Sequence, residues 1–169
     1  MFYHGGTMLP EVTPPLSIVL VHPQIPPNTG NVARLCAVTG ANLHLVEPLG
    51  FSIADKDLRR AGLDYWDRVV ARIHPDVAAW EAQAPFPRVH LFTARAAVNL
   101  WEAEFRPGDQ LVFGSEQEGL PKDLLERHAA RTVGIPQREG LRSLNLSTAA
   151  GIAMYEALRQ VVARRPEGR

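Results

Sequence analysis

The alternation of short apolar runs with helical segments constrains this chain more than any other feature of its sequence. The first run, residues 16–21 (LSIVLV), is continuous and rich in β-branched side chains, which is typical of a strand covered on both faces. A loop then leads into helical spacing, in which Asn28 or Thr29 is expected to cap the helix and Gly40 to end it. A strand, a loop and a helix in this order form the repeating unit of α/β proteins.

The same alternation continues along the rest of the chain. Further strands are predicted at residues 43–47, 69–73, 88–93, 110–114 and 131–135. Helices are predicted within residues 55–62, 74–83, 121–129 and 147–165. This order predicts an α/β fold with a mostly parallel sheet and helices on both of its faces.

The length of the chain favours one domain. A chain of 169 residues can bury about two thirds of its unfolded surface around a single core. We therefore expect a single domain over residues 16–169, preceded by a flexible leader, residues 1–15, that is rich in glycine and proline. The last helix is apolar around much of its circumference, so we expect it to pack on the sheet and also against a second copy of the chain.

Charge and cysteine content narrow the possible functions. Eighteen Lys and Arg residues balance 18 Asp and Glu residues, so binding of a nucleic acid would need a local basic patch. The single cysteine, Cys36, excludes an internal disulfide and a CxxC metal site, and it indicates a buried thiol in a reducing, cytoplasmic protein. No apolar run suits a membrane span or a signal peptide, and no histidine has metal-ligand spacing. We expect neither membrane nor metal binding.

Three loops that leave predicted strands are where a ligand is expected, because ligands of parallel sheets bind beyond the carboxyl ends of the strands. The first loop, residues 23–34, combines the opening turn of a helix with Arg34, which suits an anion. Simple capping with a solvated Arg34 is the alternative. The second loop, residues 113–121, carries two glutamates between two glycines, and its spacing matches neither a dinucleotide nor a nucleoside triphosphate motif. A plain turn is the alternative there.

The third loop, residues 135–151, is polar and leads into the apolar last helix. It offers hydroxyls and an amide at a helix start, from Ser143, Asn145, Ser147 and Thr148, and helix capping would also explain them. A serine nucleophile needs an adjacent base, and the segment contains no histidine.

Together the three loops resemble the ordered motifs of the SPOUT superfamily of RNA methyltransferases. The similar segments are residues 25–51, 55–67, 113–121 and 142–160. They look most like the small stand-alone members of the TrmL type, which methylate the ribose 2'-hydroxyl of the wobble cytidine or uridine of tRNA. The resemblance implies a homodimer, a C-terminal trefoil knot and bound S-adenosylmethionine. General folding rules alone would instead have favoured an ordinary doubly wound sheet, because threaded chains are rare.

The resemblance also implies roles for individual residues. The S-adenosylmethionine pocket is expected to be lined by Phe92, Gly114, Ile135 and Ser143. Catalytic roles are implied for Arg34, Asn145 and Tyr155, and roles in shaping the loops and the substrate site for Asn28, Asn31, Glu116 and Arg142. Where the family often has Arg or Lys before the second glycine of the second motif, this chain has Glu118.

The implied partner is the anticodon arm of a tRNA, gripped by a surface that both copies of the dimer form. Candidate phosphate contacts are Arg59, Arg60, Arg138, Arg142, Arg159, Arg164 and Arg165. Two other functions compete with the methyltransferase: a catalytically silent RNA-binding or assembly module of the same fold, and a nucleotide-binding oxidoreductase. Arg34 and the intact SLNLS segment favour the enzyme over the silent module, and the absence of GxGxxG disfavours the oxidoreductase.

Overall fold

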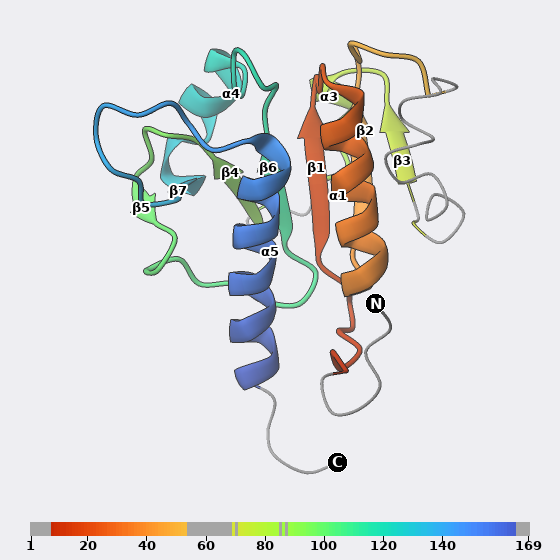
Figure 1. The fold of residues 1–169 in the computed structure, drawn as a ribbon, viewed down its shortest axis with the longest axis vertical. Coiled ribbons are helices and arrows are strands. Elements are labelled where there is room, and N and C mark those ends of the chain that lie inside the picture. Colours follow the sequence, from red (N-terminus) through yellow and green to blue (C-terminus); the bar gives the residue numbers. More distant parts are fainter. Residues whose placement is uncertain (1–7, 54–68, 70, 85, 87, 165–169) are drawn as a thin grey trace.

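A computed structural model of the chain describes residues 8–53, 69, 71–84, 86 and 88–164. Within these residues a seven-stranded sheet has the order β3-β2-β1-β6-β4-β7-β5 (Figure 1). Its strands are β1 (Ser17–Val21), β2 (Asn42–Val46), β3 (Ala71–His74), β4 (Val89–Phe92), β5 (Val98–Asn99), β6 (Gln110–Phe113) and β7 (Thr132–Gly134). Every strand pair in this sheet is parallel, so the predicted parallel sheet is confirmed.

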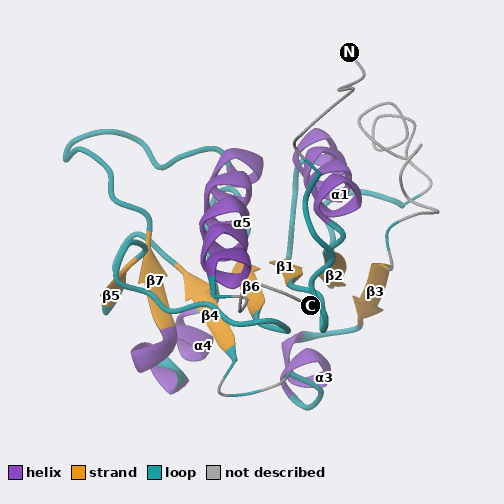
Figure 2. Cartoon of the chain, turned by 90° about the horizontal axis from the view of Figure 1, so that it is seen from below, coloured by secondary structure: helices purple, strands orange, loops and turns teal. Residues whose placement is uncertain are grey.

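Helices cover both faces of the sheet, as the sequence predicts. The long helices α1 (Pro26–Thr39) and α5 (Leu146–Ala163) lie on one face, and the short helices α3 (Val77–Glu81) and α4 (Lys122–Arg127) lie on the other (Figure 2). A 3-10 turn (Ala129–Arg131) follows α4. The helix predicted within residues 55–62 lies outside the described residues.

The central strand β1 joins the two halves of the core. Its five residues are all buried and alternate between faces: Ile18 and Leu20 join the cluster under α1 and α5, whereas Val19 and Val21 join the cluster around Trp80 of α3. A strand apolar on both faces must lie in the interior of a doubly covered sheet. This arrangement confirms the interpretation of the first apolar run.

The start of α1 corrects one prediction. The helix begins at Pro26 after Ile25, with no side-chain cap, so neither Asn28 nor Thr29 is the N-cap. Prolines at the first two positions have no backbone N–H that needs a partner, so they can open a helix without a polar cap. The predicted C-terminus is confirmed, because Gly40 ends α1 in the left-handed conformation with φ of 71°.

The predictions for the residues before the first strand and for the single cysteine can both be compared with the structure. Residues 8–15 are mostly exposed, and Val12 packs partly against the core cluster. The Cys36 thiol is fully buried, which confirms the predicted buried thiol, and burial raises its pKa to about 12. Among the described helices none is long and apolar enough to cross a membrane.

Candidate functional site

The three loops singled out in the sequence meet at the carboxyl ends of β4, β6 and β7 and at the start of α1 and α5. They enclose a pocket of about 490 Å³. Its lining includes all four residues expected to bind the cofactor, and it adds loop residues from each segment: Phe92, Gly114, Ile135, Ser143, Asn28, Glu116, Arg142 and Asn145. The pocket is within the size range of small-molecule and cofactor sites.

The second loop is a tight turn that has no room for a side chain at Gly114. A Cβ atom there would collide with the backbone of Gly119 and Leu120, because the chain folds back on itself. Ser115 and Gly119 exchange two backbone hydrogen bonds, at 3.1 and 3.0 Å, and Gly119 has φ of 72°. The turn therefore brings the backbone at Gly114 to the pocket wall and holds the residues between the two glycines at its mouth.

The Glu116 carboxylate ties this turn to the first loop. Its oxygens accept hydrogen bonds from the backbone N–H groups of Gln24 at 2.8 Å and Ile25 at 3.1 Å, and from Asn28 Nδ2 at 3.0 Å. These backbone donors lie at the start of α1, where a helix has N–H groups without partners and favours negative charge. Glu116 therefore satisfies the end of α1 from a loop about 90 residues away, in place of the predicted local cap.

Asn28 extends the same network to the third loop. Its Oδ1 accepts a hydrogen bond from Asn145 Nδ2 at 2.9 Å, and Asn145 Oδ1 in turn accepts from the N–H groups of Ser147 and Thr148 at the start of α5. Because a carboxylate only accepts and an amide both donates and accepts, each amide has one orientation that satisfies the chain of bonds. We call Glu116, Asn28 and Asn145 the polar relay. It locks the three loops together, and it confirms that the third loop also caps a helix.

Part of the remaining pocket surface is apolar. The rings of Phe92 and Phe113 stack with centroids 4.6 Å apart and an interplanar angle of 15°. Ile135 and the partly exposed Leu144 add aliphatic surface. An apolar floor with a few fixed polar groups suits an organic cofactor. No group of three metal-ligating side chains occurs among the described residues. Phe113 was not predicted as a site residue, although it directly precedes Gly114 in the sequence.

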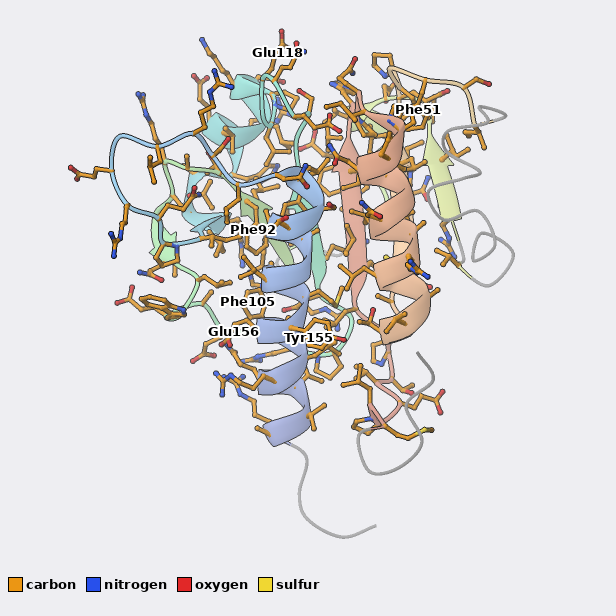
Figure 3. The ribbon with its side chains drawn as sticks, in the orientation of Figure 1. Phe51, Phe92, Phe105, Glu118, Tyr155 and Glu156 are labelled. Atoms are coloured by element: carbon orange, nitrogen blue, oxygen red, sulfur yellow. The ribbon has the colours of Figure 1, made fainter. Side chains whose placement is uncertain are left out.

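Three predicted site residues do not line the pocket. Arg34 and Asn31 are exposed on α1, and Tyr155 is half-exposed on α5 (Figure 3). At 1.5 Å per helical residue, Arg34 lies about 9 Å along α1 from Asn28. The structure therefore brings Asn28, Glu116, Asn145 and Arg142 together but leaves Arg34 and Tyr155 on another surface of the same chain.

That surface is formed by the exposed sides of two helices that pack against each other, α1 and α5. Exposed residues follow the helical repeat on both, and they are Asn31, Arg34 and Val38 on α1, and Thr148, Ile152, Tyr155 and Arg159 on α5. We call these seven residues the α1/α5 face. Val38 is 59% exposed, Ile152 40% and Tyr155 50%, so this face presents large apolar side chains to water.

The arginines predicted to contact phosphates fall into three groups. Arg138 and Arg142 are exposed in the loop before α5. Arg159 forms a salt bridge with Glu156 at 2.8 Å, and Arg164 lies 4.0 Å from Glu104. Arg59, Arg60 and Arg165 lie outside the described residues. Among the arginines of this set that the structure describes, only the first pair borders the pocket region, through Arg142 and through an adjoining hollow lined by Arg138.

Comparisons with known proteins agree with this geometry. The chain belongs to the SpoU rRNA Methylase family, whose model matches residues 15–155, and the resemblance seen in the motifs is thereby confirmed. A tRNA (cytidine(34)-2'-O)-methyltransferase of Burkholderia ambifaria is 52% identical over 147 residues, which are 85% of this chain and 94% of that protein.

Solved structures give the same relationship in three dimensions. One described as "Structural insights into the 2-OH methylation of C/U34 on tRNA" has a TM-score of 0.83 and 49% identity, and covers 88% of this chain and 97% of its own. An AdoMet-bound rRNA methyltransferase of Sinorhizobium meliloti has a TM-score of 0.76 and 25% identity, and covers 86% of this chain and 56% of its own.

Proposed function

We propose that this chain is a tRNA 2'-O-methyltransferase that transfers a methyl group from S-adenosylmethionine to the ribose of nucleotide 34, a cytidine or a uridine. The pocket joined to the polar relay carries the proposal, because all three motif loops contribute to one organised site. A relative named for the cytidine 34 reaction that is 52% identical over 147 residues supports it. A silent module would not need three loops locked around a cofactor-sized pocket.

The residues present fit S-adenosylmethionine. The stacked Phe92 and Phe113 and the aliphatic Ile135 offer an apolar surface for an adenine ring, and the backbone at Gly114 lies in the pocket wall, where its polar groups can contact the cofactor. Ser143 lines the same pocket. Bound there, S-adenosylmethionine supplies an electrophilic methyl group on a positively charged sulfur.

The chain itself must orient the ribose and stabilise the oxygen that is methylated. As the 2'-hydroxyl attacks the methyl carbon, a C–O bond would form while the bond from sulfur to that carbon breaks and releases S-adenosylhomocysteine. The hydroxyl proton would pass to water or to an RNA phosphate, and negative charge would develop on the oxygen during the step. Arg34 has a guanidinium that stays protonated at neutral pH, so we assign it to holding an RNA phosphate and stabilising the developing alkoxide rather than to accepting the proton alone. The polar relay keeps the three loops in the geometry that aligns the two reactants.

The proposed enzyme is a homodimer assembled through the α1/α5 face. This face exposes Val38, Ile152 and Tyr155, which a second copy would cover. In a two-fold dimer the same patch meets itself, and we assign Arg34 of one copy to the pocket of the other. Such a dimer explains why Arg34 lies outside the pocket of its own chain.

Three finer features complete the proposal. Residues 16–169 form one methyltransferase domain after a leader, and the C-terminal part is threaded as the trefoil knot of the family. The anticodon arm is held by a surface of both copies that includes Arg138 and Arg142. An experimental structure traced through residues 85–150 tests the knot, and an unthreaded path would contradict it.

The activity is tested with the purified chain, S-adenosylmethionine carrying a labelled methyl group, and two tRNA transcripts that bear C34 or U34. We expect the label in 2'-O-methylated nucleotide 34, identified by mass spectrometry of the nucleosides. A transcript with 2'-deoxyribose at position 34 is the matched control, because it lacks only the acceptor oxygen. Label that persists on the deoxy transcript, or no transfer to either ribose transcript, would contradict the proposal.

A further inference from the structure

Two glutamates of the same turn have opposite surroundings. The Glu116 carboxylate points inward and accepts three hydrogen bonds. Glu118 lines the same pocket but is exposed, and its carboxylate has no hydrogen bond or ion pair with another described residue (Figure 3). Only its backbone is held, since its N–H donates to Ser115 Oγ at 3.2 Å. The turn therefore fixes the backbone position of Glu118 and leaves its carboxylate exposed at the pocket mouth.

A carboxylate at the pocket mouth disfavours RNA binding unless it makes a specific contact with the RNA. Exposed charges act over about 10 Å at 0.1 M salt, so Glu118 repels phosphates that approach the pocket. A cation lines the pocket from a different loop, at Arg142. The mouth thus combines one positive and one negative group held by separate loops. A nucleotide carries the complementary pair, a phosphate for the guanidinium and a base edge for the carboxylate.

The base edge that a carboxylate can bind is a hydrogen-bond donor. An ionised carboxylate only accepts hydrogen bonds. Cytosine presents an exocyclic N4 amine, which donates, and uracil has a carbonyl oxygen at the same position, which accepts. A carboxylate facing this position binds the first base and repels the second.

We propose that Glu118 reads the base of nucleotide 34: its carboxylate accepts a hydrogen bond from the cytosine amine, and the enzyme therefore prefers C34 over U34. This inference rests on the proposed function and deepens it. It makes Glu118 a specificity-determining residue that contacts the base, while the polar relay and Arg34 serve the ribose.

The sharpest variant is Glu118→Gln, which keeps the shape of the side chain. A carboxamide can accept from cytosine N4 with its oxygen or donate to uracil O4 with its nitrogen. We expect the ratio of kcat/KM for C34 over U34 to fall about tenfold, or about 1.4 kcal/mol, chiefly because transfer to U34 rises. The substrates are two transcripts of one tRNA that differ only at nucleotide 34.

A matched control removes the same charge elsewhere. Glu126 is exposed on α4 and does not line the pocket, so Glu126→Gln should leave the C34 to U34 ratio unchanged. If Glu118 acted only through long-range repulsion, Glu118→Gln would raise kcat/KM for both transcripts equally, and the ratio would stay constant. A constant ratio, or a parental preference for U34, overturns the inference.

Failure of the inference differs from failure of the proposed function. If the parent methylates nucleotide 34 of both transcripts and the ratio does not respond to Glu118→Gln, only the role of Glu118 is wrong. If the parent transfers no methyl group to either transcript, the proposed function is wrong, and the role of Glu118 falls with it.

Discussion

The helices that cover the two faces of the sheet differ in how their side chains are paired. On one face, the short helices α3 and α4 are tied together by charges of the same chain: Glu81 accepts from Arg127 at 2.7 Å and pairs with His128 at 2.8 Å, and Arg127 also contacts Asp123 at 2.7 Å. On the other face, the long helices α1 and α5 expose Val38 and other apolar side chains to water.

This difference predicts that the α3/α4 face contributes mainly to stability and the α1/α5 face mainly to function. Helices of five and six residues are too short to be stable alone, so α3 and α4 depend on packing and on these charged contacts. The α1/α5 face instead exposes apolar side chains and Arg34, and in the proposed dimer a second copy would cover this face. Changes on the α1/α5 face should therefore reduce activity or assembly, and changes on the α3/α4 face should reduce the free energy of unfolding.

The largest expected effect is the loss of methyl transfer in Arg34→Ala, which tests the functional role of the α1/α5 face. Loss of one group that stabilises transition-state charge typically lowers turnover about 100- to 1000-fold. Because Arg34 is exposed, the variant should keep the parental free energy of unfolding and its binding of S-adenosylmethionine. Single-turnover methyl transfer and urea unfolding measure the two effects. Arg34→Lys should recover little, since the forked geometry is lost. Near-parental transfer by Arg34→Ala would place the catalytic group elsewhere.

The next effect concerns assembly. Tyr155→Asp places a charge in the centre of the exposed apolar stripe of α5, and a buried unpaired charge is strongly unfavourable. We expect the dissociation constant of the dimer to rise about 100-fold, as for a hot-spot tyrosine. Sedimentation at several concentrations measures it. Glu126→Lys on α4 is the control on the opposite face and should leave the mass unchanged. A stable and active monomer of the parent would contradict the prediction.

Acid should weaken the edge of the sheet through a buried histidine pair. His44 Nδ1 lies 3.0 Å from His74 Nε2, between β2 and β3. Burial, together with the nearby charges of His74 and Arg72, lowers the pKa of His44 to about 4. The pKa of His74 is also lowered, first by burial. Both side chains are therefore more readily protonated in the unfolded chain than in the folded one.

The sign of the pH dependence follows from these shifts. The neutral form of His44 contributes its full stability above about pH 6.5, and this contribution is lost as the pH falls toward 4. We expect the free energy of unfolding to drop by about 2 kcal/mol between pH 7.5 and pH 5, measured by urea unfolding. His44→Gln, which cannot titrate, should flatten the curve. An equal slope in parent and variant would assign the acid sensitivity to other groups.

The smallest expected effect is that of the charged contacts on the α3/α4 face. Glu81→Gln removes the common acceptor of Arg127 and His128 and should lower the free energy of unfolding by about 1 kcal/mol, less at high salt. Partial burial alone would raise the pKa of Glu81, but hydrogen bonds from His128 and Arg127 outweigh it and leave the pKa lowered. Methyl transfer should be unchanged.

A matched control is available for this pair. Glu104 pairs with Arg106 at 3.8 Å, and both side chains are more than half exposed, so Glu104→Gln should leave stability unchanged. If the two glutamine variants lose the same stability, the contacts of Glu81 do not tie α3 to α4.

The sequence predicts the parallel sheet and the meeting place of the three loops, because both depend on local signals. Strands appear as continuous apolar runs in the sequence, and Gly40 ends α1 as expected. The two-residue strand β5 was missed, since Val98 and Asn99 alone show no periodicity.

The polar relay could not be predicted from local patterns. Asn28 has the sequence position of an N-cap, and only its contacts with Glu116 and Asn145, 88 and 117 residues away, show its actual role. The positions of Arg34 and Tyr155 relative to the pocket were equally inaccessible, because the packing of α1 beside α5 decides them. Long-range polar contacts do not affect the hydrophobic periodicity of the sequence, so local patterns cannot predict them.

The polar relay also determines when, during synthesis of the chain, the functional site can form. Asn28 emerges from the ribosome early, and the amide that donates to it belongs to Asn145, near the end of the chain. Until α5 has been synthesised and docked, the loops of the first half have no fixed closing partner, however well β1 and α1 have formed. A nascent or truncated chain that ends before Asn145 therefore contains all seven described strands but has an open site, so ligand binding reports that the whole chain has folded.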